Sequence, residues 1–146
     1  MKWRFVAVGK PSLKFAKDGL AEYLKRLGRY TKAEFVPVKN GTQAEESERL
    51  FKASEGCYRI VFDERGETLS TAELTKRVDG LEMDGFIKEV AVIIGGADGH
   101  RADLREAADL VISFGRLTLQ HELALVAAVE QVYRVYTVKR GEPYHR

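Results

Sequence analysis

Short compact apolar runs alternate along the chain with longer stretches in which apolar residues recur every three or four positions. The compact runs are rich in Val, Ile and aromatic residues and are bounded by turn-forming residues, which is typical of strands. They predict strands over residues 3–8, 35–38, 58–62, 90–94 and 110–113. Residues 90–94 contain no polar position, which indicates a strand covered on both faces in a parallel sheet. Pro37 lacks an amide hydrogen, so its strand is expected at a sheet edge.

The stretches between these runs have the spacing of helices with one apolar face. Ser12 is expected as the N-cap of the first helix and Gly28 as its end. Ser70 and Glu73 have the three-residue spacing of a capping box at the start of the third helix. Helices are expected over residues 13–26, 44–51, 71–83, 104–108 and 122–136. This alternation predicts an α/β fold, with a parallel-type sheet flanked by helices.

Three loops are candidates for a binding site, because ligands of open α/β sheets bind beyond the carboxyl ends of the strands. The third strand is expected to end at residues 63–66. After the fourth strand, Gly95 and Gly96 expose bare backbone to a ligand, although a tight turn into a helix explains the same residues. This glycine string follows the fourth strand, whereas a dinucleotide fingerprint follows the first. The long apolar loop 114–119 is suited to an adenine edge, or is a packed connection.

The composition limits the possible partners. A chain of 146 residues fits one domain, residues 1–146. Its 24 Lys and Arg against 22 Asp and Glu give a net charge of +2, so any RNA site must be a local patch. Cys57 is the single cysteine, which excludes an internal disulfide and a cysteine-based zinc cluster and fits a reducing compartment. The apolar run 3–8 is too short for a signal peptide or a membrane span, so a soluble, cytoplasmic protein is expected.

The last predicted helix carries a possible subunit interface. Residues 124–129 are apolar nearly all round, which implies burial on more than one side. In a small protein the second side can face a partner subunit, so a dimer across this helix is expected. Glu130 and Arg134 form an i, i+4 pair that supports the helix. His121 at the helix start is interpreted as a capping or packing residue.

The C-terminal tail is basic and contains an aromatic side chain. Its polar candidates are Arg134, Lys139, Arg140, Tyr144, His145 and Arg146, opposed by Glu142 alone. Basic residues interleaved with an aromatic can hold phosphates and stack a base. A frayed, solvated terminus is the alternative, but Pro143 limits the freedom of the chain and favours a docked tail.

Several motifs together resemble a known family and span essentially the whole chain. They are VAVGK at 6–10, EYLKRL at 22–27, IGG at 94–96 with Gly99, EQVYR at 130–134 and RGEPYHR at 140–146. The chain resembles the ribosomal RNA large-subunit methyltransferase H family, a small branch of the SPOUT methyltransferases. The resemblance implies a homodimer with a C-terminal trefoil knot in each chain, a rare exception to the rule that chains do not thread loops.

The resemblance also implies an activity and a set of cofactor contacts. The expected reaction is methylation of N3 of a pseudouridine in large-subunit (23S) ribosomal RNA within the assembled ribosome, with S-adenosylmethionine as methyl donor. The family's cofactor-contacting positions correspond to Phe62, Gly95, Phe114, Gly115, Arg116, Leu117, Thr118 and Leu119. Two residues depart from the family pattern. Gln120 replaces the usual proline and makes the loop less rigid, and Phe62 replaces a leucine while keeping an apolar wall.

Roles in catalysis and RNA binding follow as hypotheses. His145 is the first candidate for a base at N3 or for holding the target base, with Tyr144 stacking or hydrogen-bonding and Arg134 balancing the anionic nucleotide. No metal is required. The candidate phosphate contacts are Arg116, Lys139, Arg140 and Arg146. The sequence leaves open whether the tail completes the site of its own chain or the pocket of the other subunit. Two other readings stay open: a non-catalytic ribosome-binding module with the same fold, and an α/β protein that binds another adenine nucleotide.

Overall fold

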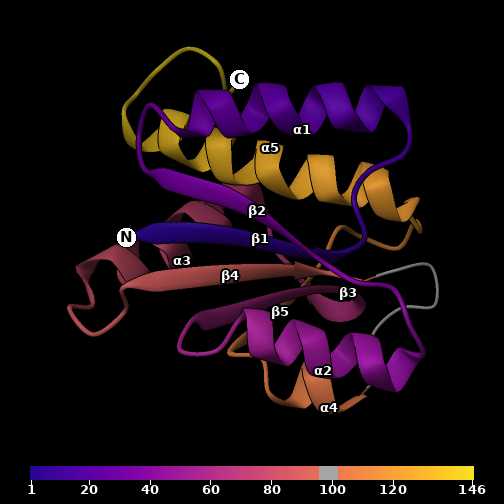
Figure 1. The fold of residues 1–146 in the computed structure, drawn as a ribbon. Helices are drawn as coiled ribbons and strands as arrows, with labels where there is room; N and C mark the ends of the chain where they lie inside the picture. Colours follow the sequence, from indigo (N-terminus) through magenta and orange to yellow (C-terminus); the bar gives the residue numbers. More distant parts are fainter. Residues whose placement is uncertain (96–101) are drawn as a thin grey trace.

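A computed structural model describes residues 1–95 and 102–146 and contains one five-stranded parallel sheet with helices on both faces (Figure 1). The strands are β1 Lys2–Val8, β2 Lys32–Val38, β3 Tyr58–Thr68, β4 Glu89–Ile94 and β5 Leu110–Ser113. The helices are α1 Lys14–Leu27, α2 Gln43–Ala53, α3 Thr71–Met83, α4 Ala102–Glu106 and α5 His121–Lys139. The α/β architecture predicted from the alternating pattern is confirmed.

The strand order β2-β1-β4-β3-β5 explains the hydrophobicity of each strand. The apolar run of β4 lies at the centre of the sheet, and residues 90–94 are all buried, as predicted. Pro37 lies in the edge strand β2, opposite Ala7 of β1. An edge position tolerates proline because one side of the strand has no ladder to complete.

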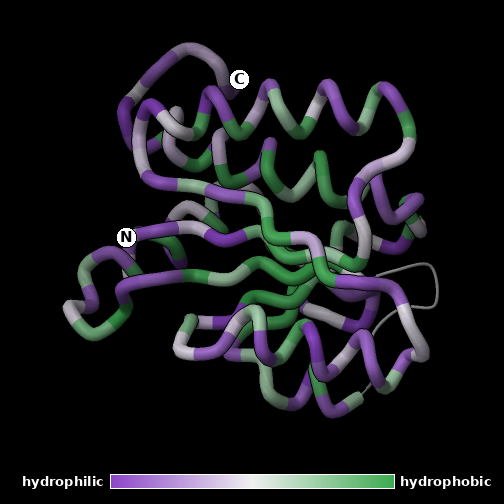
Figure 2. The backbone as a smooth tube through the Cα atoms, in the orientation of Figure 1, coloured by the Kyte–Doolittle hydropathy of each residue, from purple (hydrophilic) through white to green (hydrophobic). Residues whose placement is uncertain are grey.

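The two faces of the sheet bury separate apolar clusters. Trp3 and Phe5 of β1 pack in the larger cluster, under α1, α3 and α5, whereas Val6 points to the smaller cluster under α2 and α4. This split follows from the two-residue period of a strand. The Trp3 indole donates a hydrogen bond to the Tyr136 hydroxyl of α5 over 2.9 Å, so the buried indole nitrogen is satisfied. Figure 2 shows the apolar positions gathered in the sheet and on the facing sides of α1 and α5, with polar residues outside.

The third strand differs from its predicted end at residues 63–66. After Phe62 the chain leaves the ladder and rejoins β5 at Glu67, so that Ile112 pairs with both residues. Gly66 makes this excursion possible. A Cβ on Gly66 would lie 2.6 Å from the backbone carbonyl of Val111, closer than a real Cβ comes to any atom. The turn signal in the sequence is therefore a bulge that keeps the strand beside β5 rather than a strand end.

The helix starts agree with the sequence at one predicted cap and differ at another. Ser70 and Glu73 form the predicted capping box of α3. The N-cap of α1 is Leu13, without a side-chain hydrogen bond, so the prediction of Ser12 was wrong. The Ser12 hydroxyl is recruited instead by Glu122, 110 residues away. The hydrogen bond from the hydroxyl to the ionised Glu122 carboxylate is a strong one and directs the Ser12 side chain toward α5 rather than toward the first turn of α1.

The described residues include no helix long and apolar enough to cross a membrane. Gly96 and Gly99, which the sequence analysis singled out, lie outside the described residues. The trefoil knot implied by the resemblance stays a prediction.

Candidate functional site

A cavity of about 610 Å³ lies at the carboxyl ends of β3, β4 and β5, where the strand-end rule placed it. Its volume is in the range of small-molecule sites. Strand residues form its floor, and the segment between β5 and α5 forms its rim. The lining residues are Gln43, Phe62, Asp63, Glu64, Arg65, Ile94, Gly95, Ser113, Phe114, Gly115, Leu117, Thr118, Leu119, Gln120, His121 and Ala124.

Two aromatic rings form one wall of the cavity. Phe62 ends the first part of β3 and Phe114 follows β5, and their rings stack with centroids 4.4 Å apart and planes at 16°. The strands that carry them are hydrogen-bonded neighbours, which brings the two side chains together. Phe114 remains 37% exposed, so part of the wall is open to a ligand. A flat apolar surface of this kind can stack against a planar base.

The rim loop starts with a tight turn. Gly115 has a φ of +125°, a region that disfavours any side chain. The Ser113 hydroxyl accepts a hydrogen bond from the Gly115 amide over 3.0 Å and donates one to the Gly115 carbonyl over 2.8 Å. After this turn, Leu117, Thr118 and Leu119 line the cavity. Ser113 is not among the predicted site residues, although serine commonly forms turns by bonding to nearby backbone.

The bulge of β3 supplies a second wall that the sequence analysis missed. The side chain of Asp63 is only 5% exposed, and its Oδ1 accepts a hydrogen bond from the Arg65 amide over 2.9 Å. The guanidinium groups of Arg65 and Arg105 lie 3.6 and 3.7 Å from its two carboxylate oxygens. Asp63 thus shapes the turn through its own backbone two residues on, as aspartates commonly do. The available signal was an aspartate directly after an apolar strand.

The start of α5 is held by two side chains from the sequence Gln120-His121-Glu122. Gln120 is the N-cap, and its side-chain oxygen accepts hydrogen bonds from the amides of Glu122 and Leu123 over 2.9 and 3.0 Å. The φ of Gln120 is −61°, a value that proline also adopts. Gln120 in place of the proline expected from the resemblance is therefore compatible with the same backbone path. It also adds a side-chain cap, because proline has no side-chain acceptor.

Glu122 ties this helix start to the segment between β1 and α1. Its Oε1 accepts hydrogen bonds from the amides of Ser12 and Leu13 over 2.8 and 2.9 Å, and its Oε2 accepts one from the Ser12 hydroxyl over 2.9 Å. We call these three hydrogen bonds the Glu122 clamp. They hold the pKa of the Glu122 carboxyl below its usual 4.5, because each favours the ionised form. The clamp also fixes the position of His121, which precedes Glu122 in the chain and lines the cavity.

The structure gathers most of the predicted cofactor contacts around one cavity. Seven of the eight residues line it, namely Phe62, Gly95, Phe114, Gly115, Leu117, Thr118 and Leu119. Arg116 belongs to the same loop and is exposed, but it is not among the lining residues. Residues from three strand ends, far apart in the sequence, therefore meet at a single site.

The three predicted catalytic residues also lie together, at the other end of α5. The Arg134 guanidinium donates to Glu130 Oε1 over 2.6 Å, and its Nη1 lies 3.1 Å from His145 Nδ1. The Tyr144 hydroxyl donates to the same Glu130 oxygen over 3.0 Å, and Arg134 sits over the Tyr144 ring at 4.8 Å. Burial, together with the nearby Tyr23 and Glu130, raises the pKa of Tyr144 well above its usual range. The tail is docked rather than frayed.

Within one chain this tail cluster is distant from the cavity. His121 lines the cavity, and Arg134 lies 13 residues further along the same helix. At 1.5 Å per residue the separation along the axis is about 20 Å. The tail of the chain therefore does not reach its own cavity in this arrangement, as the positions of the C-terminus and of the start of α5 show in Figure 1.

The four predicted phosphate contacts are dispersed. Arg116 lies in the rim loop, whereas Lys139, Arg140 and Arg146 lie at the tail end. Lys139 is engaged by the carboxylates of Asp79 and Glu82. Arg140 lies over the Tyr30 ring at 5.0 Å, and Arg146 donates to the Pro143 carbonyl over 3.4 Å. All four residues are exposed, and of the four only Lys139 has an ion pair with another described residue. Among the described residues no group of His, Cys, Asp or Glu is arranged to hold a metal ion.

Comparison with known proteins gives one consistent family. Residues 1–145 match the family described as predicted SPOUT methyltransferases. The chain is 46% identical to a ribosomal RNA large subunit methyltransferase H from Thermus thermophilus, covering 100% of this chain and 99% of the relative. It is 42% identical to the protein of the same name from Deinococcus radiodurans, again over 100% and 99% of the two chains.

Solved structures agree on the fold. A probable methylase family protein from Haemophilus influenzae superposes with a TM-score of 0.61 at 13% identity, over 99% of this chain and 70% of that protein. A ribosomal RNA small subunit methyltransferase E from Neisseria gonorrhoeae, bound to S-adenosyl methionine, superposes with a TM-score of 0.54 at 11% identity, over 92% and 66%.

Proposed function

Because the chain belongs to the SPOUT methyltransferase family, we propose that it transfers a methyl group from S-adenosylmethionine to N3 of a pseudouridine in large-subunit ribosomal RNA within the assembled ribosome. The observation that carries the proposal is the cavity at the strand ends, lined by seven of the eight positions that correspond to the family's cofactor contacts. The names of the full-length relatives support ribosomal RNA as the substrate. A substrate inside ribosomes implies a cytoplasmic location.

The residues of the cavity fit the cofactor. The Phe62–Phe114 wall offers an apolar face to adenine, and the backbone of the rim loop offers amides and carbonyls to its polar edge. Gly95 allows close approach of the ligand to backbone at the end of β4. When bound, S-adenosylmethionine supplies a methyl group already activated by a sulfonium, so the protein has to bind and aim the two reactants. Correct alignment removes much of the entropic barrier.

The tail cluster provides chemistry for the target base. N3 of pseudouridine lies between two carbonyls and carries a proton, which passes to solvent water as the base ionises before methyl transfer. Arginine can only donate hydrogen bonds, so His145 Nδ1 accepts from Arg134 and the neutral ring carries its proton on Nε2. In this tautomer His145 is a donor suited to a carbonyl of the ionised base. We therefore assign His145 to stabilising the N3 anion, with Arg134 adding positive charge and Tyr144 holding the base.

A homodimer reconciles the tail cluster with the distant cavity. The tail of a second copy can reach a cavity that the chain's own tail does not. Exposed apolar side chains surround the cavity end of the molecule, with Leu117 at 84% and Phe15 at 53% exposure. Leu13 and Leu123 are also exposed, and the Glu122 clamp holds their segments together. Such a surface suits burial against a second copy. We propose that the tail of each protomer completes the cavity of its partner.

Methyl transfer from labelled S-adenosylmethionine to ribosomes that lack the modification tests the activity, with free ribosomal RNA as comparison and nucleoside analysis of the product. Methylpseudouridine formed on ribosomes is the expected result. Tight cofactor binding without transfer would indicate another substrate, and absence of cofactor binding would favour a non-catalytic ribosome-binding protein. His145→Ala should lower turnover by about 10²-fold or more while leaving cofactor binding unchanged. Unchanged turnover would remove His145 from the mechanism.

Mixed dimers test the shared site. One chain carries His145→Ala and the other carries Thr118→Trp, which blocks the cavity mouth. If the tail acts on the partner's cavity, the mixed dimer keeps one complete site, formed by the open cavity of the first chain and the intact tail of the second. The expected result is recovery of about half the turnover of the unmodified dimer. Inactive mixed dimers, with both homodimers also inactive, would show that each tail serves its own chain.

A further inference from the structure

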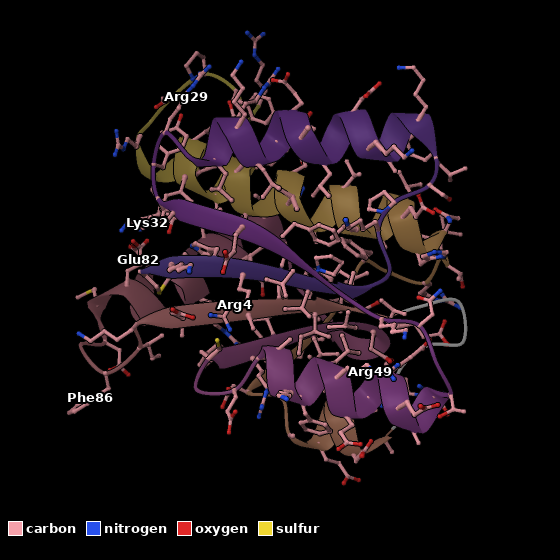
Figure 3. The ribbon with its side chains drawn as sticks, in the orientation of Figure 1. Arg4, Arg29, Lys32, Arg49, Glu82 and Phe86 are labelled. Atoms are coloured by element: carbon pink, nitrogen blue, oxygen red, sulfur yellow. The ribbon has the colours of Figure 1, made fainter. Side chains whose placement is uncertain are left out.

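Ten of the described Lys and Arg side chains pair with a carboxylate, but several at one end of the molecule do not. Ion pairs engage Lys14, Arg26, Arg49, Arg77, Arg134 and Lys139, among others. Around the turn between α1 and β2, the exposed side chains of Lys25, Arg29 and Lys32 have no ion pair with another described residue. Figure 3 shows Arg29 and Lys32 at the same end of the molecule, beside the close of α1 and the start of β2.

The C-terminal end of α5 adds a further cation to this group. Arg140 lies over the Tyr30 ring at 5.0 Å, and Tyr30 directly follows Arg29 in the chain. Tyr30 in turn stacks on Tyr136 of α5, with planes at 16°, so the turn and the helix end form one surface. We call Lys25, Arg29, Lys32 and Arg140 the tail-end basic surface.

The acidic groups at this end are already engaged. Glu22 is paired with Arg26 at 2.7 Å, and the nearby charges of Lys25 and Arg29 help to hold its pKa below the usual value. Glu142 accepts a hydrogen bond from the Tyr30 hydroxyl over 2.6 Å. That hydrogen bond raises the pKa of Tyr30 to about 12, so the ring stays neutral and adds no negative charge at physiological pH. Glu142 keeps its negative charge, but the four cations of the tail-end basic surface outnumber it, so this end carries net positive charge in a chain whose total is only +2.

We infer that the tail-end basic surface binds the phosphate backbone of ribosomal RNA and guides it into the cavity of the partner protomer. The inference rests on the proposed function and on the proposed dimer. A polyanion fits a surface of several unpaired cations, because each contact releases condensed counterions. Arg140 already lies over an aromatic ring, and a guanidinium group can contact an unstacked base as well as a phosphate.

The position of the surface determines which cavity it serves. The tail-end basic surface borders the docked tail. Arg26, in the last turn of α1 beside Lys25, lies over the rings of Tyr23 and Tyr133. Tyr133 in turn contacts Tyr144 of the tail edge-on, with ring centroids 4.7 Å apart. If the tail completes the partner's cavity, the basic surface lies at the mouth of that same cavity. RNA held there enters from the side where His145 stands.

Charge reversal of two residues that no other role requires tests the inference. Lys25→Glu with Arg29→Glu should raise the KM for ribosomes about tenfold near 0.1 M salt and reduce the slope of log KM against log salt by about 1 to 2. Turnover at saturating ribosomes and the affinity for S-adenosylmethionine should not change. Lys25→Gln with Arg29→Gln, which avoids acidic residues at the helix end, should give a smaller rise in KM. The matched control is Lys52→Glu with Lys76→Glu, two exposed helix lysines elsewhere on the molecule.

The outcomes separate this inference from the proposed function. If the unmodified protein does not methylate ribosomes, the proposed function fails and the inference fails with it. If it does, and the reversed variant has the KM of the control, only the inference is overturned. Filter binding to protein-free ribosomal RNA distinguishes the partner: weaker binding there as well supports RNA, whereas a defect confined to intact ribosomes would identify a ribosomal protein and overturn the inference.

Discussion

Replacing Glu122 with alanine should destabilise the protein more than any other single change at the rim of the cavity. The Glu122 clamp joins the first turn of α5 to the β1–α1 segment by three hydrogen bonds of 2.8 to 2.9 Å to one buried carboxylate. Each hydrogen bond to a charged group contributes about 1.5–3 kcal/mol. Ser12 and Leu13 lie at the surface, where water can replace the lost acceptor, so the contributions do not add in full. We expect a loss of about 2–4 kcal/mol in the free energy of unfolding.

Two further variants divide this loss between the donors. Glu122→Gln keeps the side-chain volume and one acceptor oxygen, but its NH₂ group faces a hydrogen-bond donor of Ser12 or Leu13. We therefore expect about half of the loss in unfolding free energy that Glu122→Ala causes. Ser12→Ala removes only the hydroxyl and should cost about 1 kcal/mol. In thermal unfolding at a fixed protomer concentration, the alanine variant at position 122 should melt about 6–12 °C below the unmodified chain.

The pH dependence gives the sharper test. The clamp lowers the pKa of Glu122 in the folded state below 4.5, so its stabilisation is present above the unfolded-state pKa and is lost as the pH falls through the lower folded-state value. The difference between the unmodified chain and Glu122→Ala should therefore be constant near neutral pH and shrink below about pH 4.5. Equal melting temperatures at pH 7, or a difference that persists unchanged at pH 3, would refute the reasoning.

Three other substitutions, two of them with a comparison variant, test the cavity wall and its supports. Gly66→Ala should lower the free energy of unfolding in urea by about 1–3 kcal/mol, because the new Cβ would meet the backbone of β5. Gly80→Ala lies inside α3, where a Cβ would meet no atom within 4 Å, and should raise it by about 0.5–1 kcal/mol. An equal effect at the two glycines would contradict the close approach. Gln120→Ala should lose the α5 cap and about 1 kcal/mol, checked by the same unfolding curve, and no loss would show that the cap is not used. Phe114→Ala should weaken S-adenosylmethionine binding about tenfold in calorimetry, because stacking and apolar contact are lost. Phe62→Leu should change the affinity only slightly. Unchanged binding in Phe114→Ala would place adenine elsewhere.

Local chemistry explains what the sequence predicted correctly. The unbroken apolar run 90–94 placed β4 inside the sheet, since a strand with no polar position has no face for water. Ser70 and Glu73 predicted the start of α3 because a capping box involves residues only three apart. Pro37 predicted an edge strand from its missing amide. Each of these signals depends on neighbours within one turn or one strand.

Longer-range contacts explain what the sequence did not predict. Ser12 has the chemistry of an N-cap, but Glu122, 110 residues away, takes its hydroxyl. The turn residues 63–66 predict a strand end, but the backbone at Gly66 approaches β5 closely and β3 pairs with β5 again from Glu67. Lys139 belongs to a basic tail in the sequence, yet the packing of α3 beside α5 brings Asp79 and Glu82 to it.

The candidate site shows the same division. The sequence by itself determined that three strand ends carry loops suited to a ligand and that a basic tail with Tyr144 and His145 follows the last helix. Only the tertiary structure decided that seven of the eight predicted contacts share one cavity, and that the tail cluster lies about 20 Å from it along α5. The physical reason is that local pattern sets the secondary structure of each segment, whereas the strand order and the length of a rigid helix set which segments meet.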